Sequence, residues 1–265
     1  MAHFISASSS LSHFFNTASR SLGALVEARY RLRTAQSDGD VRLAQSLRFS
    51  VFNLELGEGL ARSFETCLDS DPFDAVCEHL LVEDIATGNI VGTYRMQLGR
   101  TAQTYYCERE FDFSPYEAVR HDMLELGRAC IHAEHRSFAV LSLLWKGIMA
   151  YARTHGARYL VGCSSLTSQD MALGLAAYAH LQRHQVAPAF RTQPHADFVC
   201  HASKEQIQLA MEQVKIPKLL SAYLALGAGV CGLPAMDREF KTIDFLTWLD
   251  LDSPDMAQRR RRFGF

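Results

Sequence analysis

The sequence lacks a long apolar segment. A membrane-spanning helix needs roughly eighteen or more apolar residues in succession, and no such run occurs. The nearest candidate, residues 219–233, is interrupted by Ser221 and by several glycines. We therefore expect no part of this chain to span a membrane.

The sequence also lacks a surplus of basic residues. Its 27 lysines and arginines are balanced by 29 acidic residues, which gives a formal charge of −2 and an isoelectric point near 6.6. Proteins that bind nucleic acid usually present a strong positive field. We therefore expect no nucleic-acid partner.

The cysteines do not suggest a disulfide framework. They number seven, are widely scattered and never form a C-x-x-C pair. This usage is typical of a reducing compartment. We expect a cytoplasmic protein, either free or peripheral on the inner face of the cytoplasmic membrane.

The two ends of the chain differ in composition from the rest. Residues 1–29 are rich in serine and contain no acid before Glu27, and residues 259–265 begin with four arginines. We expect a mobile arm at the start, a basic tail at the end, and a folded domain over residues 30–258. Alternatives stay open for both ends. The arm could be a transit peptide or touch a membrane, and the tail could contact an acidic partner or anionic lipid headgroups, or simply be solvated.

Hydrophobic periodicity divides the domain into strands and helices. The expected strands are residues 30–34, 79–85, 90–98, 123–132, 159–163 and 242–251, with an extended stretch at 198–201. The expected helices are residues 38–52, 138–154, 168–184, a segment from Ser203 and the apolar segment 219–230. The turn Ala-Thr-Gly-Asn at 86–89 supports a hairpin. This order predicts an α/β domain whose mixed sheet has helices on both faces.

Charged residues stand inside otherwise apolar strands. Glu125 and Arg128 lie in the run MLELGRACI, Arg95 lies in the hairpin, and Asp71 and Asp74 lie in the acidic loop before it. A buried acid and a buried arginine are costly unless they pair or serve chemistry. One interpretation is a structural ion pair. The other is a site for amide formation, which needs a base for an ammonium proton and a cation for a carboxylate.

The spacing of these two residues places a condition on the strand. A regular strand points residues 125 and 128 to opposite faces of the sheet. A single site can use both only if Gly127 allows a bulge or a local break. We therefore expect a bulge at Gly127.

Several motifs resemble those of known acyltransferases. The run RFSVF at 48–52, the aspartates at 71 and 74, and Arg95 followed by Glu125 and Arg128 resemble the acyl-homoserine-lactone synthases and N-acyl amino acid synthases. These are carrier-dependent relatives of the Gcn5-type acetyltransferases. The runs CEHLLV at 77–82, ELGRACI at 125–131 and PAMD at 234–237 resemble the ornithine N-acyltransferases still more closely. The resemblance covers roughly residues 30–263 and implies that the domain at 30–258 has the Gcn5-related N-acyltransferase fold, with a mixed, mostly antiparallel sheet.

The resemblance also implies a function. A long, 3-hydroxylated fatty acyl group would pass from acyl carrier protein to the α-amine of ornithine and give lyso-ornithine lipid. No cofactor is expected beyond the carrier's phosphopantetheine thioester. Two alternatives stay open, an N-acyl amino acid synthase that uses glycine or another amino acid, and a noncatalytic module that binds lipid or carrier.

Residue roles follow from the same resemblance. Glu125 would be the general base or would orient the amine, and Arg95 and Arg128 would bind the carboxylate or maintain the electrostatics of the site. The residues expected to contact the rest of the acceptor are Arg48, Asp71, Asp74 and His79. The two aspartates would organise the substrate loop or face a side-chain ammonium. His79 could instead be a hydrogen-bonding residue of the core.

The chain lacks the glycine-rich turn on which many acetyltransferases hold the pyrophosphate of coenzyme A. The corresponding run at 135–140 is HRSFAV. A helix N-terminus there can still receive one phosphate, which favours a carrier-protein phosphopantetheine over free coenzyme A. We expect Arg136, Ser137 and Lys146 to contact the acidic carrier or its phosphopantetheine.

Two further clusters give less specific signals. Cys130 or Cys163 could act as a nucleophile, but both lie in apolar strands, where an inert thiol is more common. His132, Glu134 and His135 do not have the spacing of a known zinc site. We expect direct attack by the amine and no bound metal.

The apolar segment 216–233 carries leucines on one helical face. Core packing is the ordinary interpretation of such a face. The alternative is that it lines an acyl channel or rests on an anionic membrane surface, where a lipid product must go.

Overall fold

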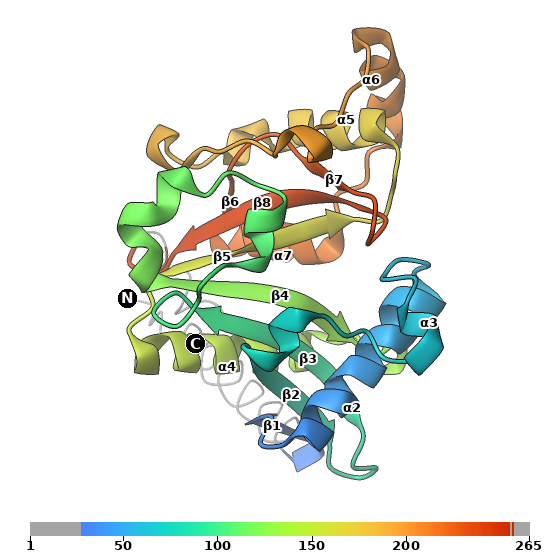
Figure 1. The fold of residues 1–265 in the computed structure, drawn as a ribbon, viewed down its shortest axis with the longest axis vertical. Coiled ribbons are helices and arrows are strands. Elements are labelled where there is room, and N and C mark those ends of the chain that lie inside the picture. Colours follow the sequence, from blue (N-terminus) through green and yellow to red (C-terminus); the bar gives the residue numbers. More distant parts are fainter. Residues whose placement is uncertain (1–27, 255, 257–265) are drawn as a thin grey trace, which may run out of the picture.

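The computed structural model describes residues 28–254 and residue 256, which build one β-sheet with flanking helices (Figure 1). The strands are β1 (Tyr30–Thr34), β2 (Glu78–Asp84), β3 (Ile90–Leu98), β4 (Met123–Ile131), β5 (Tyr159–Leu166), β6 (Gly229–Val230), β7 (Ala235–Asp237) and β8 (Thr242–Asp250). Their order is β1-β2-β3-β4-β5-β8-β6, and β7 pairs with β8. Among these strands β4 and β5 alone pair in parallel. The predicted mixed, mostly antiparallel sheet is confirmed.

Six α-helices are described, with shorter helical turns between them. The α-helices are α2 (Asp38–Arg48), α3 (Ser63–Thr66), α4 (Phe138–His155), α5 (Met171–Leu181), α6 (Lys204–Ala210) and α7 (Lys218–Leu226). The turns are η1 (Phe49–Glu55, a π-helix), η2 (Pro72–Ala75), η3 (Tyr106–Arg109), η4 (Ser114–Asp122), η5 (Ala133–His135), η6 (Gln182–His184), η7 (Pro188–Phe190), η8 (Ala196–Phe198) and η9 (Met211–Gln213). Within the described residues, no helix is both long enough and apolar enough to cross a bilayer.

Helices α2 and α4 cover opposite faces of the sheet (Figure 1). Side chains alternate along a strand, so Leu81 of β2 packs with Leu47 of α2, whereas Leu80 packs with Ile148 of α4. Each fully buried leucine contributes roughly 1.5–3 kcal/mol. The prediction of helices on both faces is confirmed.

Strands β4 and β5 separate partway along the sheet. They pair over residues 123–125 and 159–161 and then diverge (Figure 1). At the point of separation Gly162 lies against β4, because a Cβ there would stand 2.2 Å from the Leu126 carbonyl oxygen. Only glycine fits so close an approach. The divergence opens the sheet beyond Glu125.

One predicted element is wrong. Residues 198–201 were expected to be extended, but η8 ends at Phe198, whose amide donates to the His195 carbonyl at 2.8 Å. Only Val199 then makes an isolated bridge, with Ala235. The local turn satisfies the backbone that a strand ladder would otherwise pair.

The predicted arm and tail fall almost wholly outside the described residues. Ala28 and Arg29 are the exceptions, and Arg29 forms an ion pair with Asp84 at 3.4 Å. The loop 56–77 contains two short helical segments, α3 and η2.

Candidate functional site

A closed ring of alternating charges joins α2, β3, β4 and the loop before β2. In order around the ring, its members are Arg48, Asp69, Arg128, Asp71, Arg95 and Asp74. No side chain in it is more than 7% exposed. Its positive and negative charges balance, which reduces the large cost of burying ions. The structure thus brings together five of the residues that the sequence suggested.

Arg48, the last residue of α2, holds the loop side of the ring. Its Nε donates to Asp69 at 2.8 Å, and its Nη1 and Nη2 donate to Asp74 at 3.0 and 2.7 Å. Gln45, one turn earlier in α2, also donates to Asp74 at 2.9 Å. Arg48 is fully buried and does not line the cavity described below. Its geometry therefore suits a residue that positions the loop.

The loop residues of the ring are ordered by a local cap. The Asp71 carboxylate accepts from the Phe73 amide at 2.9 Å, and the Asp74 carboxylate accepts from the Asp71 amide at 3.3 Å. With Pro72 at the first position of η2, this is a capping box. The sequence DPFD thus orients both carboxylates through local hydrogen bonds, independently of the arginines.

Arg95 and Arg128 form the cavity side of the ring. Arg95 Nη1 donates to Asp71 at 2.6 Å and to Asp74 at 3.0 Å, and Arg128 Nη2 donates to Asp71 at 3.0 Å. Burial alone would raise the pKa of Asp71. The guanidiniums of Arg95 and Arg128 nevertheless hold this pKa below its ordinary value. The Nε of Arg128 lies 3.3 Å from Asp69 but makes no hydrogen bond. This ion pair between Arg128 and Asp69 closes the ring.

Strand β4 bulges where the ring meets it. The register with β3 shifts between Thr93 and Arg95, so that Arg128 and Ala129 together face one residue of β3. The predicted bulge is present. The residue with a left-handed backbone is Arg128, with a φ of 52°, and not its neighbour Gly127. Tertiary contacts of the arginine side chain therefore outweigh the backbone preference for glycine.

Stacking and ion pairs hold Arg128 in this conformation. Its guanidinium lies 4.7 Å from the ring centroid of Tyr106 and 4.4 Å from that of Phe240. A left-handed, non-glycine backbone costs roughly 1–2 kcal/mol, and a desolvated cation–π contact contributes about as much. Strain of this kind is commonly found at functional sites.

Glu125 lies beside the ring, in the part of β4 that still pairs with β5. Its two carboxylate oxygens accept the backbone amides of Tyr106 and Cys107 at 2.9 and 2.8 Å. Burial raises the pKa of Glu125 in spite of these hydrogen bonds. Each oxygen keeps a further lone pair. Glu125 lines the cavity, so it can accept a proton from a bound amine.

His79 lies behind the ring and does not line the cavity. It faces Arg95 across the β2–β3 pair, and its Nε2 donates to the Asp74 backbone oxygen at 3.1 Å. Burial lowers the pKa of His79, so its imidazole is neutral near pH 7. This geometry favours the interpretation of His79 as a core residue that supports Asp74.

A cavity of about 660 Å³ passes through the sheet where β4 and β5 diverge. Its volume lies in the usual range for small-molecule sites, roughly 300–1,000 Å³. The charged part of its wall includes Glu58, Arg95, Glu125, Arg128 and Asp244. The apolar part includes Leu141, Leu144, Leu219, Leu220 and Tyr223 from α4 and α7. One continuous space therefore joins a polar site to an apolar channel.

Two of the three expected carrier-binding residues line this cavity. They are Arg136 and Ser137. Ser137 caps α4, where its hydroxyl accepts from the Val140 amide at 3.4 Å. Arg136 forms a two-pronged ion pair with Glu55 at 2.5 and 2.8 Å. Lys146 lies on the exposed face of α4 and outside the cavity.

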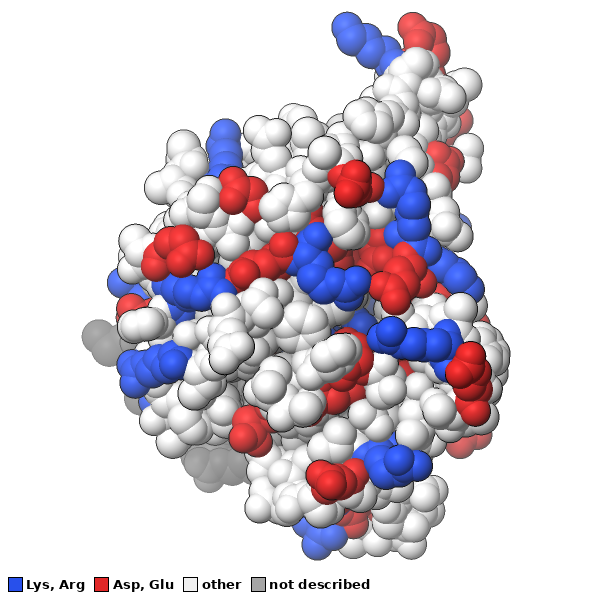
Figure 2. Space-filling view, viewed as in Figure 1, with Lys and Arg blue, Asp and Glu red and all other residues white. Residues whose placement is uncertain are grey.

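The face of the molecule that carries α2 and α3 has mixed charge. Figure 2 shows acidic and basic side chains interleaved across its middle, and no large area of one sign gathers among the described residues drawn there. This face therefore lacks a basic landing area for an acidic partner.

The two candidate nucleophilic cysteines are poorly suited to that role. Burial raises the pKa of Cys130, and a hydrogen bond to Cys107, together with burial, raises that of Cys163. The thiolate is the reactive form of cysteine. Both thiols stay protonated near neutral pH, which favours direct attack by the amine.

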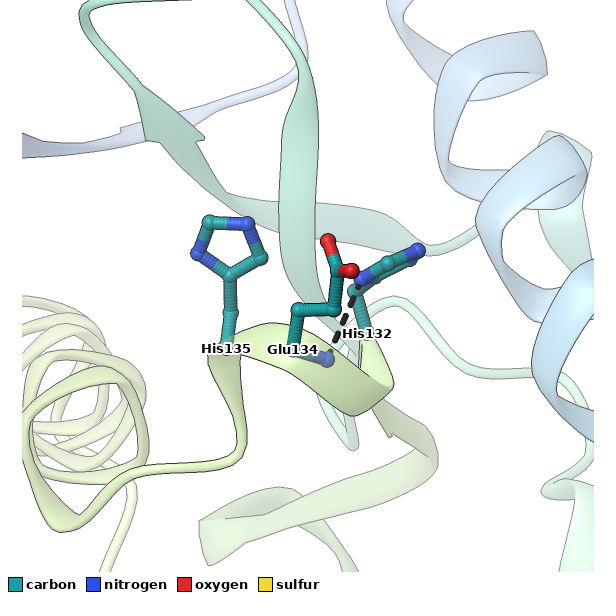
Figure 3. Close-up of side chains that lie close together, drawn as sticks. All are labelled: His132, Glu134 and His135. Carbon is teal, nitrogen blue, oxygen red and sulfur yellow. Dashed lines mark hydrogen bonds between the residues drawn. The ribbon is translucent and has the colours of Figure 1, made fainter.

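The donor atoms of His132, Glu134 and His135 lie within 4.8 Å of one another. Figure 3 shows that the Nδ1 of His132 instead accepts from the Glu134 amide, at 3.4 Å. His135 Nδ1 forms a hydrogen bond with the Tyr30 hydroxyl at 3.0 Å. These protein contacts already use one ring nitrogen of each histidine.

Sequence reasoning missed four residues that the site uses. Asp69 completes the ring, Tyr106 stacks on Arg128, and Glu110 and Asp244 form a second acidic group described below. Asp69 could have been suspected, because it stands in the same acidic run as Asp71. The other three come from distant segments and gave no local signal.

Comparisons with known proteins agree with this geometry. The acetyltransferase (GNAT) domain family matches residues 47–146. An N-acyl amino acid synthase from uncultured soil microbes superposes with a TM-score of 0.52 at 12% identity, over 88% of this chain and 93% of that one. The fold and the domain match define a GNAT acyltransferase.

Two relatives identify the family within the GNAT acyltransferases. The L-ornithine N(alpha)-acyltransferase of Rhodobacter capsulatus is 32% identical over 254 residues, which cover 91% of this chain and 96% of the relative. That of Brucella abortus is 33% identical over 237 residues, covering 83% and 84%. The chain belongs to the L-ornithine N(alpha)-acyltransferase family.

Proposed function

We propose that this protein transfers a long fatty acyl group from acyl carrier protein to the α-amine of ornithine and so makes lyso-ornithine lipid. The observation that carries the proposal is the division of one cavity into an apolar part and a charged part. The apolar part suits a fatty acyl chain, and the charged part suits an amino acid. The names of the two relatives supply ornithine as the acceptor.

The chemistry requires a neutral amine. Its nitrogen attacks the thioester carbonyl carbon, so a C–N bond forms and the C–S bond breaks. Glu125 takes the proton that the amine must lose, since its oxygens keep lone pairs inside the cavity. After the attack the nitrogen loses a second proton, which the departing thiolate takes up. The products are an amide, the free carrier thiol and protonated Glu125, which returns its proton to solvent.

Arg95 and Arg128 bind the carboxylate of the amino acid. The described hydrogen bonds use only Nη1 of Arg95 and Nη2 of Arg128, and each guanidinium has five N–H donors. A fork of donors matches a carboxylate well. The ring aspartates hold the two arginines in place.

The donor enters beside α4. The amides at the start of α4, capped by Ser137, receive the phosphate of phosphopantetheine. Arg136 exchanges Glu55 for the carrier or its phosphate, and the exposed Lys146 and Arg153 face the acidic carrier. In the apolar part, the hydroxyls of Tyr94 and Tyr223 form a hydrogen bond with each other. We assign them to the acyl 3-hydroxyl.

The product leaves where the cavity meets the surface. Phe138, 68% exposed, and Leu56, 39% exposed, both belong to the cavity lining. Exposed apolar groups at such a mouth suit peripheral contact with a membrane that takes up the product.

Purified protein tests the proposal directly. It is incubated with ornithine or glycine and with the same 3-hydroxyacyl chain on carrier protein or on coenzyme A, and products are measured by mass spectrometry. We expect N-acylornithine from the carrier donor and a loss of turnover in Glu125→Gln but not in Glu117→Gln. Acylated glycine alone would overturn the ornithine assignment, and no acylated amine would support a noncatalytic module.

A further inference from the structure

A second group of buried acids lies apart from the charge ring. We call Glu58, Glu110 and Asp244 the acidic recess. Their residues are 5%, 1% and 3% exposed, and none forms a salt bridge with any part of the chain that the structure describes. Arg109 acts on Glu110 at longer range but makes its ion pair with Glu239 at 2.9 Å. Buried negative charge in the recess therefore lacks a direct counter-ion.

The recess opens into the cavity. Asp244 and Glu58 both line it. The Asp244 carboxyl interacts with the side chains of Ser165, Thr242 and Glu110, but its Oδ1 is buried without a hydrogen-bond partner. Ligand atoms of Glu110, Cys163 and Asp244 lie within 4.8 Å of one another. Buried polar atoms are nearly always paired, so an unpaired carboxylate oxygen in a cavity wall indicates a missing ligand with a donor.

The raised pKa values of the recess carboxyls agree with the absence of a neighbouring cation. Burial, with the neighbouring acids, raises the pKa of Asp244 to about 6 and that of Glu110 well above its ordinary range. Burial also raises the pKa of Glu58. A cation placed among the three would bring these values down again.

A short path of contacts links the recess to the proposed base. Glu125 accepts the Cys107 amide at 2.8 Å, and Cys107 Sγ lies 3.3 Å from Cys163 Sγ. Cys163 Sγ in turn lies 3.8 Å from Glu110 Oε2. The thiols of Cys107 and Cys163 therefore lie between Glu125 and the recess.

We propose that the acidic recess binds the side-chain ammonium of the acceptor and so selects a short diamino acid. This inference rests on the proposed function, whose α-amine and carboxylate sites lie at Glu125 and the two arginines. The two amines of ornithine stand about 6 Å apart when extended, from ordinary single-bond lengths. The ring aspartates are not suited to this role, because Asp71 and Asp74 each already accept from two arginines.

The donor atoms of Glu110, Cys163 and Asp244 also lie close enough together to hold a metal ion. Metal content is therefore measured as one outcome of the test.

Acceptor choice tests the proposal. Wild-type protein and Asp244→Asn are compared with ornithine and with norvaline, which has the same carbon chain without the second amine. We expect the wild type to favour ornithine by on the order of 10²-fold in kcat/KM. Asp244→Asn should lose most of that preference through KM for ornithine while its kcat/KM for norvaline changes less. Glu58→Gln tests the same point should Asp244→Asn not fold.

Stability provides a second readout. Because folding raises the pKa of Asp244 from 3.8 to about 6, the free energy of unfolding falls as pH rises between these two values, and the full cost is present at pH 8. We therefore expect Asp244→Asn to melt higher than the wild type at pH 8, and ornithine to stabilise only the wild type. Glu117→Gln is the control, since Glu117 is 60% exposed and pairs with Arg120 outside the recess.

The outcomes separate the two proposals. Equal wild-type use of norvaline and ornithine would overturn the recess assignment and leave the acyltransferase proposal standing. Equal loss of both substrates in Asp244→Asn, with a lower melting temperature, would indicate a structural role and also overturn it. A stoichiometric metal that Asp244→Asn loses would do the same. If the wild type acylates neither amino acid, the proposed function fails and the recess proposal falls with it.

Discussion

Arg128 Nη2 donates to Asp71 Oδ2 at 3.0 Å across 57 residues of sequence. This one contact ties the bulge of β4 to the loop before β2, and it closes a ring in which every aspartate meets two arginines. The ring supports the site from behind while two of its arginines face the cavity. Its members should therefore divide into those that affect stability and those that affect catalysis.

Arg48 should mainly affect stability. Arg48→Met leaves Asp69 and Asp74 without their main partner, and breaking a buried pair from one side costs about 3–5 kcal/mol. Denaturant unfolding measures this change. Arg31→Met, which removes an exposed partner of Glu83, should cost about 0–1 kcal/mol. Similar small losses in both variants would contradict the ring's structural role.

Arg128 should belong to the second group. Arg128→Lys keeps the charge but loses the planar fork that binds a carboxylate. We expect kcat/KM for ornithine to fall by on the order of 10²-fold, with a much smaller change for putrescine, the same diamine without the carboxylate. Steady-state kinetics with both amines checks this. An equal loss of kcat/KM with both amines would show that Arg128 has only a structural role.

The strands and most helices could be predicted because their signals are local. The hairpin β2–β3 has two runs rich in apolar residues and a turn of four between them, and Ser37 and Ser137 begin helices as caps. The site was only partly predictable. Asp244 reaches the cavity because β8 pairs with β5, a contact between residues about eighty positions apart. Pairing of this kind leaves no trace in local sequence.

The bulge illustrates the same limit at a single residue. Glycine at 127 predicts the place where the backbone departs from a regular strand, since it has the lowest barrier to left-handed conformation. The structure puts that conformation on Arg128, because ion pairs and two aromatic rings hold the side chain there. Local preference was outweighed by contacts that only the folded chain makes.

Glu125 should set the acidic limb of the pH profile. A general base must be deprotonated, so kcat/KM should rise with pH through the pKa of Glu125, which burial places above the ordinary value. Glu125→Gln should lower kcat by about 10²–10⁴-fold and remove that limb. The variant also loses one of two amide hydrogen bonds, at a cost of about 1–3 kcal/mol, so the role of Glu125 is assigned from the pH profile.

The exposed Glu117 provides the control for this profile. It pairs with Arg120 at 3.0 Å and is 60% exposed. Glu117→Gln should keep the wild-type limb. Retention of the limb in Glu125→Gln would show that another group is the base.

The apolar part of the cavity should limit acyl length. Leu141 of α4 lines it, and Leu141→Trp would fill part of the space. Competition between carrier-bound donors of different length should shift toward shorter chains. Leu209→Trp, on the exposed face of α6 and outside the cavity, should leave the preference unchanged. An unaltered preference in Leu141→Trp would place the acyl chain elsewhere.

The central claim is that the α-amine of ornithine attacks a carrier-bound thioester while the side-chain amine is held away from it. Tandem mass spectrometry of the product formed by purified protein from 3-hydroxyacyl carrier protein and ornithine tests this most directly. The account predicts N-acylornithine with the acyl group on the α-nitrogen alone. Acylation of the side-chain nitrogen, or the absence of any acylated ornithine, would contradict it.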